Sequence, residues 1–305
     1  AGQITVTDTN QRALELAWKS FALSGAEADF RHGSLFEPVP GTYDLIVSNP
    51  PFVISPDGRF GYRESALAGD DLCRLLVEQA PDHLNDGGWC QLLANWLHVE
   101  GESWEDRVAG WIDGCDAWVV QRDVQDPAEY AELWLGDSCE TGSPQYRQRY
   151  GEWLDYFARN KVTGIGFGWI SLRKGGGAVR IEELRHAVEQ PVGGYVETVL
   201  DGFAAARLGV SDTVRTAEGI VQEQIGPPGA DDPERIVLRQ TAGLRRAAGV
   251  GTVEAALAGV CDGTIPLEPL LGAIAQLTGM DEQSVRDHTQ AVLPELIADG
   301  FFYNG

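Results

Sequence analysis

The sequence predicts an α/β fold with a largely parallel sheet in its N-terminal part, followed by a mainly helical C-terminal part. Three observations indicate this. Residues 3–8 form a β-branched run that ends in an acid and precedes a segment of helical apolar spacing. The apolar run 45–47 stops at a pair of prolines, a pattern typical of a strand buried on both faces of a parallel sheet. From about residue 189 the strand pattern gives way to helical segments.

The first strand-helix unit places an acid, Asp8, at a strand tip. Asn10 is a good N-cap for the helix that follows, and Gly25 closes that helix. In nucleotide-binding folds an acid at such a tip commonly accepts hydrogen bonds from ribose hydroxyls. The alternative interpretation is that Asp8 is a turn residue or a helix cap.

The central stretch is Asp44 to Phe52, with the sequence Asp-Leu-Ile-Val-Ser-Asn-Pro-Pro-Phe. Its strand ends at the edge of the sheet where open α/β folds bind ligands. The side-chain oxygen of Asn49 and the carbonyl of Pro50 form two neighbouring acceptors, which suit the two donors of a planar amino group. Phe52 offers a flat face for stacking. The alternative is a turn that merely ends the strand, with Phe52 as an ordinary core aromatic.

Asn-Pro-Pro-Phe in this context resembles the acceptor motif of the class I S-adenosylmethionine-dependent amino-methyltransferases. These enzymes methylate planar nitrogens, either glutamine amides of release factors or exocyclic amines of RNA and DNA bases. The resemblance implies a Rossmann-like sheet and S-adenosylmethionine as cofactor. It implies that Asn49 and the Pro50 carbonyl orient the nitrogen, that Phe52 stacks on the acceptor and that Asp8 holds the ribose. Asn49 is also expected to border the cofactor.

Two features depart from the family pattern. The family often carries an acid that binds the adenine amino group where this chain has Ser34, so Ser34 or nearby backbone is expected to take that role, with a plain turn serine as the alternative. The family's glycine-rich loop precedes the unit that ends at Asp8, yet only seven residues lie before Asp8. The glycines of residues 163–169 do not replace it, because they run into a strand-like stretch and not a helix, as in a hairpin. The catalytic domain is therefore expected to be N-terminally incomplete.

The resemblance divides the chain into a catalytic domain, residues 1–186, and a C-terminal winged-helix-like accessory domain, residues 187–305. Residues 62–71 are partly similar to the loop that follows the motif in the glutamine methyltransferases. The segments expected in the C-terminal domain are three helices, at 252–260, 267–277 and 282–298, and a terminal strand at 300–303.

The amino-acid composition limits the kinds of partner that the protein is expected to bind. The formal charge of −23 opposes non-specific binding to nucleic acid. Residues 251–305 contain eight acids and one arginine, which opposes DNA reading and favours a packing or protein-docking module. Five cysteines without a C-x-x-C pair suit a reducing, cytoplasmic location and predict no metal site. No apolar run approaches the length of a membrane span.

The sequence is compatible with two classes of methyl acceptor, a protein glutamine and a nucleic-acid base. Acidic charge and the similarity of residues 62–71 favour a protein glutamine, as in release factors. Phe52 in place of the tyrosine usual in the glutamine enzymes, and two groups of basic residues, favour an rRNA or DNA base. These groups are Arg147, Arg149, Arg159 and Lys161, then Arg235, Arg239, Arg245 and Arg246; solvated helix faces are their alternative interpretation. A third possibility is a catalytically inactive methyltransferase-like scaffold, motivated by Ser34 and the absent glycine-rich loop.

Overall fold

The computed structural model describes residues 2–56, 67–137, 141–208, 212–228 and 233–305. The chain forms two compact units, residues 1–181 and 182–305. Residues 62–66, part of the stretch that is similar to the glutamine methyltransferases, lie outside the described residues.

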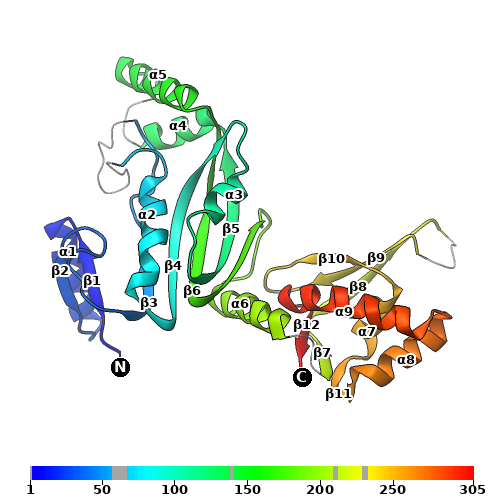
Figure 1. Ribbon diagram of the computed structural model, residues 1–305. Coiled ribbons are helices and arrows are strands. Elements are labelled where there is room, and N and C mark those ends of the chain that lie inside the picture. Colours follow the sequence, from blue (N-terminus) through cyan, green and yellow to red (C-terminus); the bar gives the residue numbers. More distant parts are fainter. Residues whose placement is uncertain (1, 57–66, 138–140, 209–211, 229–232) are drawn as a thin grey trace. The chain divides into compact units, whose positions relative to one another are not determined.

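The N-terminal β-α-β unit matches the expectation. Strand β1 (Thr5–Asp8) pairs in parallel with β2 (Asp29–His32), and helix α1 (Gln11–Leu23) connects them (Figure 1). The Asn10 side chain accepts hydrogen bonds from the backbone N–H groups of Arg12 and Ala13, as an N-cap does. The β1-β2 pair is a sheet of its own.

A four-stranded sheet in the order β3-β4-β6-β5 forms the rest of the first unit's framework. Its strands are β3 (Tyr43–Ser48), β4 (Leu84–Val99), β5 (Cys115–Gln125) and β6 (Val162–Glu183). β3 runs parallel to β4, and β6 runs antiparallel to β4. Helices α2 (Asp71–Gln79) and α3 (Trp104–Ala109) and the 3-10 turn η1 (Ala80–His83) accompany this sheet. The expected α/β fold class is confirmed for this unit, whose four-stranded sheet is mixed.

One expectation about β3 is wrong. The strand exists where it was expected, but it is not buried on both faces, because Leu45 is 58% exposed and Val47 is 70% exposed. The two residues are two apart and so share one face, whereas Ile46 on the other face packs against the core. The physical reason is that no helix or strand covers the face of Leu45 and Val47 within the described residues, where β4 is the only element in extensive contact with β3.

The glycines of residues 163–169 run into a strand, as expected, and lie inside the long strand β6. The hairpin expected to close after that stretch is not formed, because β6 continues to Glu183. Gly166 pairs with Trp96 and Gly168 with Ala94 across the β4-β6 ladder. A Cβ at Gly166 would lie 2.2 Å from Nε1 of Trp96, and one at Gly168 would lie 1.8 Å from the carbonyl oxygen of Val120. These glycines therefore permit close packing within the sheet.

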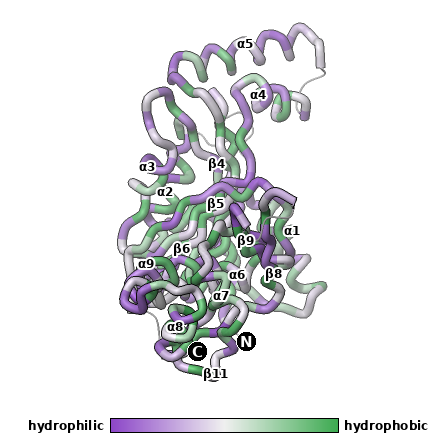
Figure 2. Tube along the Cα trace, turned by 90° about the vertical axis from the view of Figure 1, so that its right-hand side faces the viewer, coloured by the Kyte–Doolittle hydropathy of each residue, from purple (hydrophilic) through white to green (hydrophobic). Residues whose placement is uncertain are grey.

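Two helices, α4 (Pro127–Gly136) and α5 (Pro144–Arg159), stand between β5 and β6 in the chain and pack against each other. Hydrophobic positions concentrate along β4 and β5, whereas hydrophobic and hydrophilic positions alternate along α5 (Figure 2). The buried side of the pair carries Tyr130, Trp153 and Phe157, which form an apolar cluster with Val53 and Ile54. The helix pair thereby packs directly against the residues that follow the Asn-Pro-Pro-Phe motif.

The second unit contains two small sheets and four helices among its described residues. One sheet has the order β10-β9-β8 and the other β11-β7-β12. Their strands are β7 (Thr213–Thr216), β8 (Ile220–Ile225), β9 (Arg235–Gln240), β10 (Ala247–Val250), β11 (Asp262–Pro266) and β12 (Phe302–Asn304). The helices are α6 (Gly193–Leu208), α7 (Thr252–Val260), α8 (Leu267–Thr278) and α9 (Glu282–Ala298). The three helices expected from periodicity are present, while the winged-helix resemblance remains a prediction.

The cysteines that the structure describes are free thiols buried in the two cores. Burial raises the pKa of Cys73 and of Cys90 to about 12, and that of Cys115 and of Cys261 to about 11. These four thiols therefore stay protonated in the folded protein at neutral pH.

We expect these four thiols to resist alkylation by iodoacetamide at pH 8 in the native protein, because the reactive species is the thiolate. A pKa of about 12 leaves about one thiol in ten thousand ionised, and a pKa of about 11 leaves about one in a thousand. In urea all four should react within minutes. Mass spectrometry of tryptic peptides after alkylation measures both states. Rapid native labelling of Cys73, which is 1% exposed, would contradict the packing of the first unit's core.

Candidate functional site

The residues predicted to bind the methyl acceptor, Asn49, Pro50 and Phe52, lie at the carboxyl end of β3, and we call them the acceptor clamp. Asn49 is exposed and Pro50 is buried. The backbone N–H of Phe52 donates to the Pro50 carbonyl at 2.7 Å, which closes a tight turn. A carbonyl oxygen has two lone pairs, so the Pro50 oxygen keeps a second acceptor position. Within the part of the chain that the structure describes, no hydrogen bond engages the side-chain amide of Asn49. The tip therefore presents an amide oxygen to solvent from a backbone that is held in place.

Phe52 is half-buried and packs among aromatic rings. Its ring centre lies 5.5 Å from that of Phe167, tilted by 53°, and 6.4 Å from that of Trp134, close to perpendicular at 74°. These contacts are those of a core aromatic, which was the alternative interpretation. They also hold the ring in one orientation, and its exposed part is what an acceptor could stack on.

The predicted cofactor residues Asp8 and Ser34 lie near each other at the ends of β1 and β2. The register pairs Asp8 with His32, and the backbone N–H of Gly33 donates to the Asp8 carbonyl at 3.1 Å. The Asp8 side chain accepts a hydrogen bond of 2.6 Å from the Asn10 N–H through Oδ1, so it does act as the turn residue of the alternative interpretation. Its other oxygen, Oδ2, remains, and Ser34 is half-buried.

The predicted site residues thus form two groups. Asn49, Pro50 and Phe52 follow β3 in the four-stranded sheet, whereas Asp8 and Ser34 belong to the separate β1-β2 sheet. The structure brings together the members of each group, and no strand pairing joins the two sheets within the described residues.

Some of the basic residues that were considered as nucleic-acid contacts are buried. Arg149 on α5 is only 3% exposed, and Arg246 is 6% exposed. The Arg246 guanidinium pairs with Glu182 and Asp299, each at 2.5 Å. Arg239 pairs with Glu223 at 2.7 Å across the β8-β9 ladder. For Arg149 and Arg246 the solvated-face interpretation is wrong, because each lies inside the protein; neither is placed to meet a phosphate.

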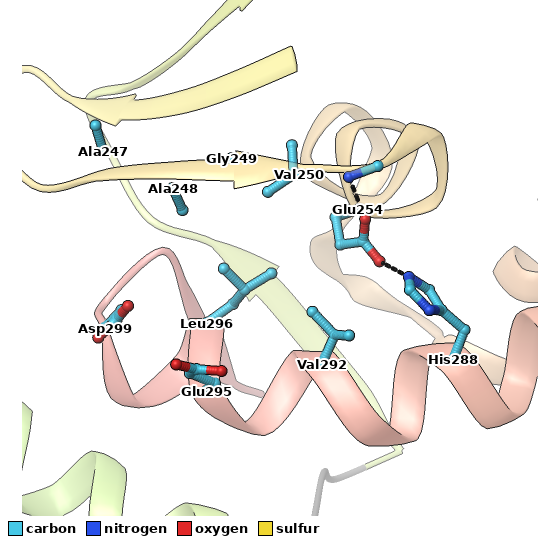
Figure 3. Close-up of a pocket in the computed structure, with 11 residues that line it drawn as sticks. Ala247, Ala248, Gly249, Val250, Glu254, His288, Val292, Glu295, Leu296 and Asp299 are labelled. Atoms are coloured by element: carbon cyan, nitrogen blue, oxygen red, sulfur yellow. Dashed lines mark hydrogen bonds and ion pairs between the residues drawn. The ribbon is translucent and has the colours of Figure 1, made fainter. Parts of the chain in front are cut away.

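A cavity of about 410 Å³ lies in the second unit between β10 and α9 (Figure 3). Its walls are mostly apolar, and at one end the carboxylate of Glu254 lies 2.5 Å from Nε2 of His288. The same carboxylate accepts the backbone N–H of Gly251 at 2.7 Å, which caps helix α7. No residue predicted for catalysis or cofactor binding lines this cavity, and Glu254 already has a structural role in it.

Two long-range contacts of the first unit were not predicted from the sequence. The hydroxyl of Tyr130 accepts a hydrogen bond from the backbone N–H of Ile54, although the two residues are 76 positions apart. The buried carboxylate of Asp70 accepts from the Leu97 N–H at 2.9 Å and pairs with Arg107 at 2.6 Å. Neither contact has a local sequence pattern, because each joins distant parts of the chain.

The described residues show neither a metal site nor a membrane-spanning helix. They contain no cluster of three histidine, cysteine or acidic side chains placed to hold a metal ion. No helix within the described ranges is both long enough and apolar enough to span a membrane.

Comparison with known proteins identifies the N-terminal third of the chain. Residues 1–99 match the family described as the methyltransferase small domain. The release factor glutamine methyltransferase of Deinococcus radiodurans is 34% identical over 119 residues, which cover 36% of this chain and 43% of that relative. The ribosomal RNA small subunit methyltransferase C of Haemophilus influenzae is 36% identical over 93 residues, covering 30% and 25%. The chain thus spans less than half the length of these curated relatives.

Solved structures give a fainter likeness. A methyltransferase from Pyrococcus furiosus aligns over 57% of this chain and 63% of its own, with 18% identity and a TM-score of 0.30. A class I S-adenosylmethionine-dependent methyltransferase from Listeria monocytogenes, described as putative, aligns over 65% and 55%, with 13% identity and a TM-score of 0.34.

Residues 1–99 therefore match a methyltransferase family, and the resemblance inferred from Asn-Pro-Pro-Phe is confirmed for this segment. S-adenosylmethionine is the methyl donor of this family. The residues at the ends of β1 and β2 fit part of that cofactor, because Oδ2 of Asp8 is an acceptor for a ribose hydroxyl and the Ser34 hydroxyl both donates and accepts.

Proposed function

We propose that this chain carries the acceptor site of an S-adenosylmethionine-dependent N-methyltransferase whose acceptor is the side-chain amide of a protein glutamine. The observation that carries the proposal is the tip of β3, where an unengaged, exposed Asn49 amide follows a strand and precedes the buried, hydrogen-bonded turn at Pro50. A side-chain amide and a backbone carbonyl held side by side suit the two N–H donors of one planar nitrogen.

The chain's own residues act by positioning. The Asn49 oxygen and the second lone pair of the Pro50 carbonyl accept the two N–H bonds, which fixes the plane of the amide and directs its nitrogen lone pair out of that plane. S-adenosylmethionine supplies an electrophilic methyl group on a sulfonium. As positive charge develops on the acceptor nitrogen its N–H bonds become more acidic, so the Asn49 and Pro50 oxygens would bind more strongly in the transition state than in the ground state. One N–H proton then leaves to solvent.

Asp8 is proposed to hold the ribose through Oδ2, since its Oδ1 is engaged by Asn10. Ser34, next to Asp8, is proposed to contact the adenine. Phe52, held by Phe167 and Trp134, is proposed to limit the acceptor's tilt. Each of these roles uses a group that the surrounding packing already orients, which lowers the entropic cost of binding.

Two observations favour a protein glutamine over a nucleic-acid base. The formal charge of −23 repels phosphates. Among the basic residues that were candidates for contacts with nucleic acid, Arg149 and Arg246 are buried and Arg239 is paired with Glu223. A cytoplasmic protein substrate, such as a release factor, is the partner that this reasoning favours.

The test measures cofactor binding and transfer separately. S-adenosylhomocysteine is titrated calorimetrically into the 305-residue chain and into any longer form that its gene encodes. Transfer of a radiolabelled methyl group is then measured onto release factor, onto the same factor with its methylated glutamine replaced by alanine, and onto ribosomal RNA. We expect transfer to the unaltered factor alone. Transfer to RNA would overturn the choice of acceptor, and neither binding nor transfer in any form would support the inactive scaffold.

A further inference from the structure

We infer that the helix pair α4–α5 positions the acceptor clamp through the Tyr130 hydroxyl, which accepts a hydrogen bond from the backbone just after the clamp, and that the Tyr156 hydroxyl anchors the same helix pair to the chain before α2. This inference rests on the proposed function and names Tyr130 as its positioning residue, with Tyr156 as a second anchor. Neither tyrosine lies in the segment that matches the methyltransferase small domain, which ends at residue 99.

The first anchor lies two residues beyond Phe52. Ile54 is 1% exposed, and its backbone N–H donates to the Tyr130 hydroxyl at 3.0 Å. Tyr130 is 2% exposed, and the side-chain amide of Asn95 on β4 donates to the same hydroxyl oxygen at 2.6 Å. A buried backbone N–H needs a partner. The Tyr130 hydroxyl therefore ties the chain after Phe52 to both α4 and β4.

The second anchor lies just before α2. The backbone N–H of Gly69 donates to the Tyr156 hydroxyl of α5 at 3.0 Å. The next residue, Asp70, is buried and joins β4 and α3 through Leu97 and Arg107. Burial raises the pKa of Tyr156, so this hydroxyl stays neutral through the physiological range.

Aromatic packing also connects helix α4 to Phe52 of the clamp. Trp134, one turn after Tyr130 on α4, meets the Phe52 ring edge to face, and its ring centre lies 6.2 Å from that of Tyr130. Phe52, Ile54 and Tyr130 thus belong to one packed group. A shift of α4 would move Phe52 and the turn at Pro50 together, and the two acceptors work only while they remain aligned with the amide plane.

The test is Tyr130→Phe, which removes one oxygen atom and keeps the ring. Hydrogen exchange followed by NMR should show the Ile54 amide exchanging at least tenfold faster, with Gly69 unchanged. Tyr156→Phe should do the reverse. The matched control is Tyr150→Phe on α5, whose hydroxyl makes no hydrogen bond among the described residues and whose ring stacks on Tyr146. It should alter neither amide.

In methyl transfer, Tyr130→Phe should lower kcat by about tenfold while the affinity for S-adenosylhomocysteine changes by less than twofold, because a misplaced clamp acts on the acceptor alone. A merely structural role would lower the fraction of folded enzyme and leave kcat per folded molecule unchanged. Unchanged Ile54 exchange, or an equal loss of kcat in Tyr150→Phe, would overturn the inference. If the wild-type chain transfers no methyl group but Tyr130→Phe still speeds Ile54 exchange, the proposed function fails and the anchoring stands.

Discussion

Asn49→Ala is expected to reduce methyl transfer by at least about a hundredfold while the affinity for S-adenosylhomocysteine stays within about threefold of the unaltered protein. The reason is that the substitution removes an acceptor that strengthens in the transition state. Because Asn49 is exposed and unengaged within the described part of the chain, its loss leaves no buried group unpaired, and folding should be unaffected.

The measurement is single-turnover methyl transfer beside calorimetric titration of S-adenosylhomocysteine. Asn85→Ala is the matched control: it removes the same side chain from an exposed position at the start of β4, where the amide nitrogen donates to the Asp44 carboxylate and no role in binding the methyl acceptor is proposed. It should transfer at the normal rate. Equal loss of transfer and cofactor affinity in Asn49→Ala would show that this residue binds the cofactor and that the role proposed for it is wrong.

Gly168→Ala should have the largest effect on stability. An added Cβ would lie 1.8 Å from the carbonyl oxygen of Val120 and 2.9 Å from the Trp96 ring. Trp96 is fully buried, and Val120 belongs to the neighbouring strand β5, so neither moves without disrupting the sheet. We expect the free energy of unfolding of the first unit to fall by more than about 4 kcal/mol, a loss that only severe overpacking or similar damage produces.

Gly164→Ala, in the same strand, is the control. There the added Cβ would meet a Val124 methyl group at 3.2 Å, and a side chain at the end of β5 can shift by a few tenths of an ångström. We expect a change below about 1 kcal/mol, partly offset by the lower entropy of the unfolded alanine chain. Urea unfolding followed by tryptophan fluorescence compares the two variants. Similar unfolding midpoints would contradict the close approach of β6 to β5.

Sequence reasoning reached those parts of the protein that depend on local patterns. The helices α7, α8 and α9 follow from apolar periodicity, and the Asn10 cap follows from residue type. The end of β3 at Asn49 follows from two prolines that cannot continue a strand. The Asn-Pro-Pro-Phe motif indicated a resemblance to methyltransferases because it consists of four consecutive residues, and residues 1–99 match the methyltransferase small domain family.

The rest depended on which distant segments meet. The sequence predicted a buried strand at Leu45 and Val47, yet both are exposed because no element of the described chain packs over their face of β3. Arg149 and Arg246 read as surface charges, but burial and the carboxylates of Glu182 and Asp299 make Arg246 part of the second unit's interior.

By itself the sequence determined the chemistry of the clamp, since an amide, a carbonyl and a ring that are adjacent in the chain stay adjacent in any fold. Only the tertiary structure decided what holds that clamp. The Tyr130 hydroxyl is 76 residues away from Ile54, and Tyr156 is 87 residues away from Gly69. No periodicity or composition records such contacts, because they arise only when β5 and β6 bring α4 and α5 beside the end of β3.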